Sequence, residues 1–236
     1  NPFDWKSKTG GFGDIIENGG FDAVIGNPPY IRIQGLPKEQ IEYFNSEYKS
    51  AKGNYDIYAL FVEKALNLLK DTGIHGYILP HKFFQASYGE GLRKLITEGN
   101  TLSEIVNFRD NQVFEGASTY TCLLFLSKNK AQKFKYAEIK TLVRPSEQLA
   151  AIMESDNVSD ETLKSGLISR KQATPAAWNF HFEEANSLIE KLARNSEPLE
   201  EVTERIFQGL KTSADKIYIL DVRTRKKATV TVFSRQ

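Results

Sequence analysis

Four consecutive residues, Asn27, Pro28, Pro29 and Tyr30, combine a carboxamide, two proline rings and a phenol. Each proline fixes its own φ angle, and a residue that precedes a proline is held in extended geometry. Asn27 and Pro28 both precede a proline, so the side-chain oxygen of Asn27 and the carbonyl oxygen of Pro28 can form a rigid pair of hydrogen-bond acceptors. Tyr30 adds a flat aromatic face beside them.

Two acceptors next to an aromatic ring match the exocyclic amino group of a planar base. The N6 amine of adenine is a poor nucleophile because its lone pair is delocalised into the ring. Acceptors that hold both of its hydrogens favour a more tetrahedral nitrogen, and preorganised dipoles of this kind contribute on the order of a few kcal/mol each. In duplex DNA the base must first be turned out of the stack. We interpret residues 27–30 as catalytic; the alternative is a proline-rich turn after a strand.

The segment that leads into this motif, FDAVIG at 21–26, is a short apolar run typical of a buried strand in a parallel sheet. Open α/β sheets bind ligands beyond the carboxyl ends of such strands. Residues 1–20 are glycine-rich and are expected to form a loop. The patterns that follow predict helices at 36–48, 55–70 and 88–99 and strands at 74–80, 102–110, 118–128 and 133–142, with Asp71, Thr72 and Gly73 as the C-cap of the second helix. Their order predicts an α/β open sheet.

The motif and its surroundings resemble a known family. The stretches NPFDW, GGFDAVIGNPPYIR, GNYDIYALFVEKALNLLKDTGIHGYILP and VFEGASTYTCLLFL resemble, in order and spacing, the amino-group (N6-adenine) DNA methyltransferases of the TaqI-like branch, which includes fused type II restriction-modification proteins. The resemblance covers roughly residues 1–130. It implies the C-terminal half of a Rossmann-like methyltransferase sheet. The implied activity is site-specific methylation of N6 on a flipped adenine in double-stranded DNA.

The resemblance also implies roles for single residues. Asn27 and Pro28 would hold the target amine, with Pro29 completing the rigid motif. Tyr30 would stack on the flipped adenine, and Phe114 would pack on the other face of that base. The alternative for Phe114 is a core aromatic side chain next to a strand.

The cofactor implied by the resemblance is S-adenosylmethionine, with Asn27, Tyr55 and Asp56 near its pocket. Tyr55 and Asp56 could equally belong to the start of a helix. The family binds this cofactor mainly through a glycine loop after its first strand and an acidic residue after its second, and neither pattern is present. The glycines of GGFGD, at 10–14, have no apolar strand before them. We therefore expect a fragment that begins after three strands of the usual sheet and has weak or no activity alone.

The sequence changes character beyond Lys128. We expect residues 1–145 to be a partial methyltransferase catalytic region and 146–195 to be a helical connector, with an amphipathic helix at 182–195. Residues 196–236 would begin a mixed α+β target-recognition domain, with a strand at 216–222. The stretch IFQGLKTSADKIYIL is similar to the opening of the TaqI-like recognition domain.

Other functions remain open at this stage. Asp110, Glu138 and Lys140 have the outline of a metal-dependent nuclease triad, D…E-x-K, although alternating polar residues in a strand produce E-x-K easily. The chain could instead recognise DNA for a fused or partner restriction nuclease without chemistry of its own. A basic run near the C-terminus could then contact phosphates, or form an ordinary solvated face: Arg223, Arg225, Lys226, Lys227 and Arg235.

Bulk composition narrows the setting. The formal net charge of +1 gives no support to nucleic-acid binding, so any such surface must be local. The single cysteine, Cys122, lies in an apolar run and is expected to be a core thiol in a reducing compartment. No apolar run reaches the roughly 18 residues of a membrane span, and no secretion signal is visible. We expect a bacterial or archaeal cytoplasmic protein without a membrane partner.

The remaining histidines and tryptophans suggest no further chemistry. His75, His81 and His181 do not cluster in the sequence, and together with one cysteine they give no metal-site spacing. His81 follows Pro80 at the end of a predicted strand, where a surface turn or a pocket rim is possible. Two tryptophans are interpreted as packing residues: Trp5 and Trp178.

Overall fold

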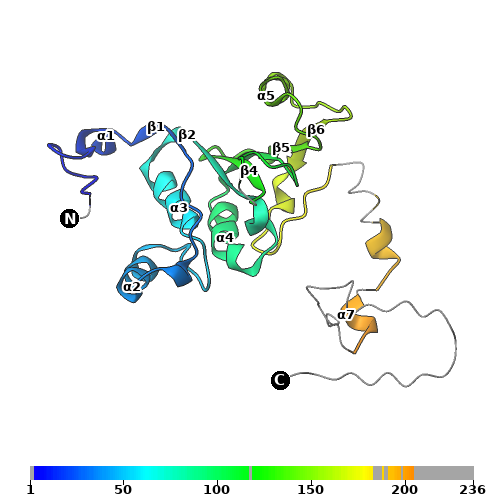
Figure 1. Ribbon diagram of the computed structural model, residues 1–236, viewed down its shortest axis with the longest axis horizontal. Coiled ribbons are helices and arrows are strands. Elements are labelled where there is room, and N and C mark those ends of the chain that lie inside the picture. The colour runs from blue at the N-terminus through cyan, green and yellow to red at the C-terminus, as the bar shows by residue number, and fades with distance from the viewer. Residues whose placement is uncertain (1–2, 117–118, 183–187, 189–190, 198, 205–236) are drawn as a thin grey trace. The chain divides into compact units, whose positions relative to one another are not determined.

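The computed structural model describes residues 3–116, 119–182, 188, 191–197 and 199–204 of the 236-residue chain. The chain divides into two compact units, Asn1–Leu188 and Ile189–Gln236. The first unit contains the sheet and its covering helices (Figure 1). Among the described residues of the second unit is a short helix, α7, Leu199–Val202.

A six-stranded sheet of mixed direction forms the first unit, in the order β1-β2-β4-β3-β5-β6. The strands are β1 Phe21–Gly26, β2 Leu69–Pro80, β3 Leu102–Asn107, β4 Thr121–Ser127, β5 Lys133–Ile139 and β6 Leu163–Ser169. β1 runs parallel to β2, and β3 runs parallel to β5. β4 is antiparallel to both β2 and β3, and β6 is antiparallel to β5. The carboxyl ends of β1, β2 and β3 therefore lie at one edge of the sheet.

Helices cover both faces of this sheet. The α-helices are α1 Gly13–Glu17, α2 Lys38–Glu47, α3 Tyr58–Leu68, α4 Glu90–Glu98 and α5 Pro145–Glu154. Single 3₁₀ turns follow several of the strands and loops: η1 Ile33–Gly35, η2 His81–Phe84, η3 Ser87–Gly89 and η4 Arg170–Gln172. α3 and α4 lie on one side of the sheet and α5 lies on the other (Figure 1).

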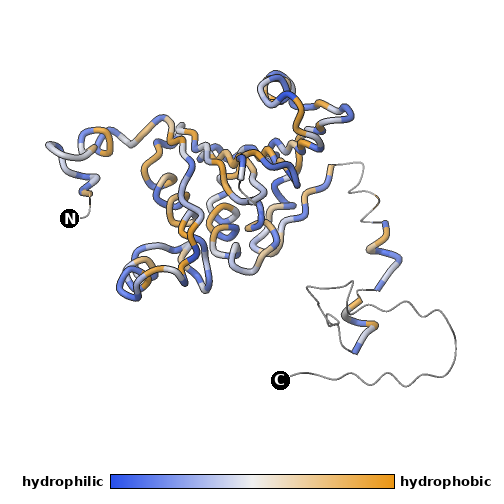
Figure 2. The backbone as a smooth tube through the Cα atoms, viewed as in Figure 1, coloured by the Kyte–Doolittle hydropathy of each residue, from blue (hydrophilic) through white to orange (hydrophobic). Residues whose placement is uncertain are grey.

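The core follows the alternation of side chains along each strand. In β3, Ile105 belongs to the cluster under α3 and α4, whereas its neighbour Val106 belongs to the cluster under α5. Successive side chains of a strand point to opposite faces, so an unbroken apolar run is what a sheet covered on both sides requires. Figure 2 shows hydrophobic residues concentrated along α3 and the central strands, while much of α2 is hydrophilic. Trp178, 1% exposed, joins the first cluster, which confirms its packing role.

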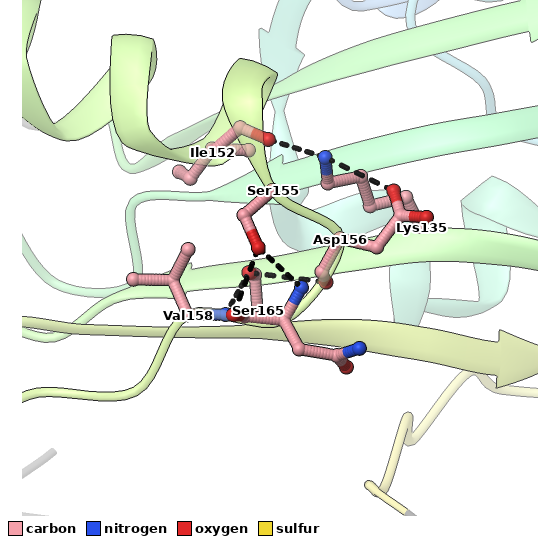
Figure 3. A network of polar contacts seen from close by, with 7 residues as sticks. Lys135, Ile152, Ser155, Asp156, Val158 and Ser165 are labelled. Carbon is pink, nitrogen blue, oxygen red and sulfur yellow. Dashed lines mark hydrogen bonds and ion pairs between the residues drawn. The ribbon is translucent and has the colours of Figure 1, made fainter.

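Polar contacts fasten the end of α5 to the outer strands (Figure 3). The Lys135 ammonium group, in β5, donates a hydrogen bond to the carbonyl oxygen of Ile152 and lies 3.4 Å from the carboxylate of Asp156. In β6, the hydroxyl oxygen of Ser165 accepts a hydrogen bond from the backbone N–H of Val158 at 3.0 Å. These contacts fix the loop between α5 and β6, and Val158 of that loop also packs against the hydrophobic cluster under α5.

The structure confirms the α/β open sheet and corrects one predicted helix end. The strand at 21–26 and the helix that follows Pro37 are present. Asp71, Thr72 and Gly73 do not cap a helix, because α3 ends at Leu68 and they lie inside β2. Leu69 is 1% exposed and already pairs with Phe21, so burial of its side chain draws the backbone into the sheet at that point. The next paired residues, Ala23 and Ile74, leave the turn-forming residues as an irregularity within the strand.

Two elements were missed, and several predictions fall outside the described residues. α1 forms within the expected loop at 1–20, and β6 lies in the interval expected to be a helical connector. Of the predicted helix at 182–195, residue 188 and residues 191–194 are helical, while 183–187 and 189–190 lie outside the described residues. The strand at 216–222, the likeness at 206–220 and the basic run at 223–235 also lie outside them.

Candidate active site

The candidate site lies at the edge where β1, β2 and β3 end. β1 delivers Asn27 to this edge directly after Gly26, which pairs with Tyr77 of β2. A Cβ atom on Gly26 would lie 3.0 Å from the Tyr77 ring, so a larger residue here would require that ring to shift by a few tenths of an ångström. Ligand sites of open α/β sheets form at such carboxyl edges.

Asn27 is open to solvent. Its side chain is exposed, and among the described residues no hydrogen bond occupies its carboxamide. Pro28 is buried and Pro29 is exposed. An asparagine that merely stabilised a turn would bond to a neighbouring backbone group. The free carboxamide beside a buried proline favours the catalytic interpretation of the motif over the proline-rich turn.

Tyr30 is held at both ends. Its hydroxyl group donates a hydrogen bond to the carbonyl oxygen of Ile78 in β2 at 3.1 Å. Its ring meets the ring of Tyr58 edge to face, with 6.3 Å between the centroids. Burial, with a smaller contribution from Cys122, raises the pKa of Tyr30 to about 12, so the phenol stays neutral and remains a donor. The ring therefore has a fixed position beside Asn27.

The segment that leaves the motif is paired with the start of α3. Ile33 N–H donates to the carbonyl oxygen of Tyr55 at 3.1 Å, and Ile57 N–H donates to that of Ile31 at 2.9 Å. Between these two hydrogen bonds, Arg32 and Asp56 are paired in an isolated antiparallel β-bridge. The structure thus brings Tyr55 and Asp56 next to the residues that follow Tyr30.

Tyr55 and Asp56 are nevertheless committed to the protein itself. Tyr55 is 2% exposed, and its hydroxyl group donates to the side-chain oxygen of Asn45 at 3.0 Å. Asp56 is half-buried; burial raises the pKa of its carboxyl group, opposed by the charge of Arg32 and a hydrogen bond with Tyr58. Both side chains stabilise the start of α3 and the segment paired with it.

Phe114 lies in the connection between β3 and β4, at the same edge. Its side chain is 36% exposed and, in the described part of the chain, stacks on no other ring. It is therefore not a core aromatic residue. An exposed ring on a connection that starts at this edge remains available to a ligand.

Several residues at this edge were not recognised in the sequence. His81 Nδ1 lies 2.9 Å from the side-chain oxygen of Asn107, which also accepts the backbone N–H of Arg109 at 2.9 Å. With Lys82 and Tyr120 these residues line a pocket of about 590 Å³. Only His81, at the end of a predicted strand, had been considered for a pocket rim. A polar asparagine at the carboxyl end of an apolar strand was the signal that could have revealed the rest.

The described residues do not form a site for S-adenosylmethionine, the cofactor that the resemblance in the sequence implies. The segment 10–14 precedes α1, and no strand precedes it in the described part of the chain. The cleft of about 750 Å³ beside β1 is lined by apolar and aromatic side chains together with Lys64, and no carboxylate of a described residue lines it. With Tyr55 and Asp56 engaged elsewhere, Asn27 is the one expected cofactor contact whose side chain is open.

The residues of the possible nuclease triad serve separate contacts. Glu138 accepts a hydrogen bond from the Tyr136 hydroxyl group at 3.0 Å, and Lys140 donates to the carbonyl oxygen of Asp160 at 3.0 Å. Among the described residues, no group of three or more His, Cys, Asp and Glu side chains is placed to hold a metal ion. Cys122 is buried, as expected for a core thiol, and burial raises its pKa.

The fold matches two solved structures, a methyltransferase subunit and a restriction endonuclease. One is the methyltransferase subunit of a type I system from Streptococcus thermophilus, with a TM-score of 0.50 and 19% identity over 66% of this chain and 35% of that one. Another is the type IIG restriction endonuclease BpuSI, with a TM-score of 0.54 and 17% identity over 84% of this chain and 26% of that one. The six-stranded mixed sheet therefore shares its fold with parts of these two proteins.

Sequence comparison narrows the class. Residues 1–114 match the family described as Eco57I restriction-modification methylase. The chain is 32% identical over 225 residues to the type II restriction enzyme and methyltransferase RM.Eco57I of Escherichia coli, covering 93% of this chain and 20% of that protein. It is 27% identical over 217 residues to the type II methyltransferase M.BstVI of Geobacillus stearothermophilus, covering 88% and 39%. Residues 1–114 are thus similar to that methylase family, and the chain spans only part of the length of the two type II relatives that it matches.

None of the helices in the described part of the chain is long and apolar enough to cross a membrane.

Proposed function

We propose that this chain holds the acceptor base of a site-specific, adenine-specific DNA methyltransferase in a restriction-modification system. The observation that carries the proposal is the exposed, unoccupied carboxamide of Asn27 at the carboxyl edge of the sheet, beside the anchored ring of Tyr30. Homology to type II DNA methyltransferases supports the same reaction class. The substrate is double-stranded DNA from which the target adenine has been flipped.

In this proposal the motif acts on the N6 amine of adenine. The side-chain oxygen of Asn27 and the carbonyl oxygen of Pro28 each accept one hydrogen of that amine. The nitrogen becomes more tetrahedral, and its lone pair is localised where it can attack an electrophilic methyl carbon. The bond between that carbon and the sulfur of the donor would break as the N–C bond forms, and the amine would then lose one N–H proton to solvent. Because the prolines fix the backbone in advance, the two acceptors need no reorganisation during the reaction.

The two aromatic residues hold the base in this proposal. Tyr30 offers a ring whose position is fixed by Ile78 and Tyr58. Phe114, exposed on the connection after β3, covers the opposite face of the adenine. Stacking between two rings replaces the base–base stacking lost on flipping.

In this proposal, residues other than those described bind the methyl donor. Homology implies S-adenosylmethionine as donor, yet the described side chains lack the glycine turn and the carboxylate that would hold it. The contribution of this chain is therefore to bind and orient the acceptor.

A chimaera tests the proposal. This chain would replace the matching segment of RM.Eco57I, and transfer of labelled methyl groups to DNA would be measured. Changing Asn27→Ala should lower the rate about a hundredfold or more, as loss of a preorganised polar group in an active site does. Asn129→Ala is the matched control, since Asn129 is exposed after β4, at the opposite edge of the sheet, and should leave the rate unchanged.

The result also separates catalysis from recognition. Binding of DNA should survive Asn27→Ala while methyl transfer is lost. A chimaera with the far-UV circular dichroism and melting temperature of its parent, but whose rate is the same with Asn27 or with alanine, would contradict the proposal.

A further inference from the structure

A second pocket, of about 590 Å³, opens where β2 and β3 end, at the same edge as the candidate active site. Its volume is that of a small-molecule site. Polar and aromatic side chains line it: His81, Lys82, Asn107, Arg109, Asp110 and Tyr120. The amine-holding role proposed above uses none of them.

Two cationic side chains line this pocket. Lys82 and Arg109 are both exposed, and neither forms an ion pair with a described residue, although the charge of Lys82 also acts on Asp56, where it opposes the rise in the pKa of that carboxyl group. Asp110 is the one carboxylate in the lining, so positive charge is in excess. A guanidinium group and an ammonium group that line one pocket are suited to a phosphate, because arginine binds its oxygens in pairs and lysine adds a point charge.

Arg109 is held in an unusual backbone conformation. Its φ angle is +52°, in the left-handed region that residues other than glycine rarely adopt. The side-chain oxygen of Asn107 accepts its backbone N–H at 2.9 Å and so stabilises this conformation. Strained residues of this kind concentrate at ligand sites, where the strain fixes a side chain in place.

Aromatic rings form another part of the wall. The His81 ring lies 6.1 Å from that of Phe84 with an interplanar angle of 28°, and 6.2 Å from that of Tyr120 with an angle of 33°. Tyr120 is 43% exposed, so it has surface available to a flat ligand. Aromatic platforms beside cations are the common means of binding single-stranded nucleic acid.

Hydrogen bonding fixes the tautomer of His81. The oxygen of the Asn107 carboxamide must face Arg109 N–H, so His81 Nδ1 is the donor to that same oxygen, at 2.9 Å. The amide nitrogen of Asn107 donates to the Tyr136 hydroxyl oxygen at 3.2 Å, and that hydroxyl group donates to Glu138 at 3.0 Å. This network orients the imidazole ring and leaves Nε2 of the neutral ring as an acceptor.

We propose that this pocket binds one nucleotide of a DNA strand, with its phosphate on Lys82 and Arg109 and its base against Tyr120. The inference rests on the proposed function in taking DNA as the ligand. The Tyr30 hydroxyl group bonds to Ile78, three residues before His81. An extended chain spans at most about 10 Å over that distance, or roughly three base steps of a strand. The bound nucleotide is therefore a near neighbour of the flipped adenine.

Photocrosslinking of the full chain tests this assignment without knowledge of the recognition sequence. The probe is a short single-stranded oligonucleotide that carries 5-bromodeoxyuridine, and the crosslinked peptides are identified by mass spectrometry. The expected crosslinks fall on Tyr120 or His81. Crosslinks confined to other segments would overturn the proposal.

A double variant tests the phosphate contact. Lys82→Ala with Arg109→Gly should weaken oligonucleotide binding about tenfold and reduce the slope of log K against log salt by about 0.7, the value for one phosphate of a single strand. Glycine adopts a positive φ readily, so Arg109→Gly removes the guanidinium group without adding strain. Lys49→Ala with Lys52→Ala is the matched control, because it removes two exposed cations at another cavity. Equal losses in both double variants would overturn the proposal.

Two further results discriminate between ligands and between proposals. Free thymidine monophosphate should compete with the oligonucleotide only weakly; equal competition would mean that the pocket takes a free nucleotide and would overturn the assignment to a strand. The crosslink requires neither a methyl donor nor turnover. If methylation depends on Asn27 but no crosslink forms at Tyr120 or His81, the proposal that this pocket binds a nucleotide is overturned. The proposed function is then unaffected.

Discussion

At the scale of single residues, Tyr30 combines two separable contributions. Its ring offers a face to the base, and its hydroxyl group ties that ring to Ile78. In the chimaera, Tyr30→Phe keeps the ring and should lower methyl transfer only a few-fold, with a loss of about 1 kcal/mol in the free energy of unfolding. Tyr30→Ala removes the stacking surface, worth about 1–3 kcal/mol per base, and should lower the rate at least tenfold more.

The comparison needs both rate and stability. Methyl transfer and urea unfolding would be measured on the same preparations, so that a loss of fold is not mistaken for a loss of stacking. Equal rates for the phenylalanine and alanine variants would show that the ring is not used for binding the base.

His75 is a second residue whose environment predicts behaviour. It is fully buried in β2, and neither ring nitrogen has a hydrogen-bond partner. Burial lowers its pKa from 6.5 to about 4, opposed by a smaller effect of nearby backbone groups at His75 and Leu124. The unfolded chain therefore binds the extra proton between these pH values. The free energy of unfolding should fall as the pH drops from 6.5 to 4, by on the order of 3 kcal/mol.

Urea unfolding at pH 7 and at pH 4.5 measures this contribution. His75→Leu should flatten the dependence and should not reduce stability at pH 7, since it removes an unsatisfied buried polar group. His181→Gln, a histidine whose side chain is only half-buried, should retain the full dependence. If the free energy of unfolding of His75→Leu depends on pH as strongly as that of the unchanged chain, the dependence does not arise from His75.

At the scale of elements, the position of β1 against β2 determines where the motif lies. A methyl group on Gly26 would meet the Tyr77 ring at 3.0 Å. Gly26→Ala should therefore destabilise the fold by about 1–3 kcal/mol, as overpacking does, and displace Asn27. Gly35→Ala is the control, because a Cβ atom there meets no atom within 4 Å. Thermal unfolding and methyl transfer would be measured for both variants. Equal losses of stability and rate in Gly26→Ala and Gly35→Ala would contradict the prediction.

The central elements could be predicted because their periodicity is set by burial. The strand at 21–26 and the strands later found at 102–107, 121–127 and 133–139 are apolar on one or both faces, which sequence patterns register directly. β6 was missed because Leu163–Ser169 contains a glycine and two serines and lies at the outer edge of the sheet. The C-cap at 71–73 was wrong because turn-forming residues also occur at irregularities within strands.

The site was only partly predictable, for a related reason. Asn27 and Tyr30 are close in sequence and share one motif, so a local pattern was enough to propose them. The pocket of His81, Asn107 and Tyr120 joins residues from the ends of different strands, and only the strand order brings them together. Tyr55 was proposed for the cofactor pocket by resemblance, whereas its burial and its bond to Asn45 could not be read from the sequence.

At the scale of the whole molecule, the described residues carry the acceptor side of the proposed reaction. The chain spans 20% of RM.Eco57I and 39% of M.BstVI. No carboxylate of a described residue lines the cleft along β1. The chain alone should therefore give weak or no transfer of labelled methyl groups from S-adenosylmethionine to DNA, whereas the chimaera should be active. Robust turnover by residues 1–236 alone would show that a donor site has been overlooked.

The identity of the modified base tests the central claim most directly. DNA from cells that express the chimaera would be digested to nucleosides and analysed by mass spectrometry. A rigid pair of acceptors at Asn27 and Pro28 beside the Tyr30 ring predicts N6-methyldeoxyadenosine, lost on Asn27→Ala and retained on Asn129→Ala. Methylated cytosine in place of methylated adenine would contradict the account.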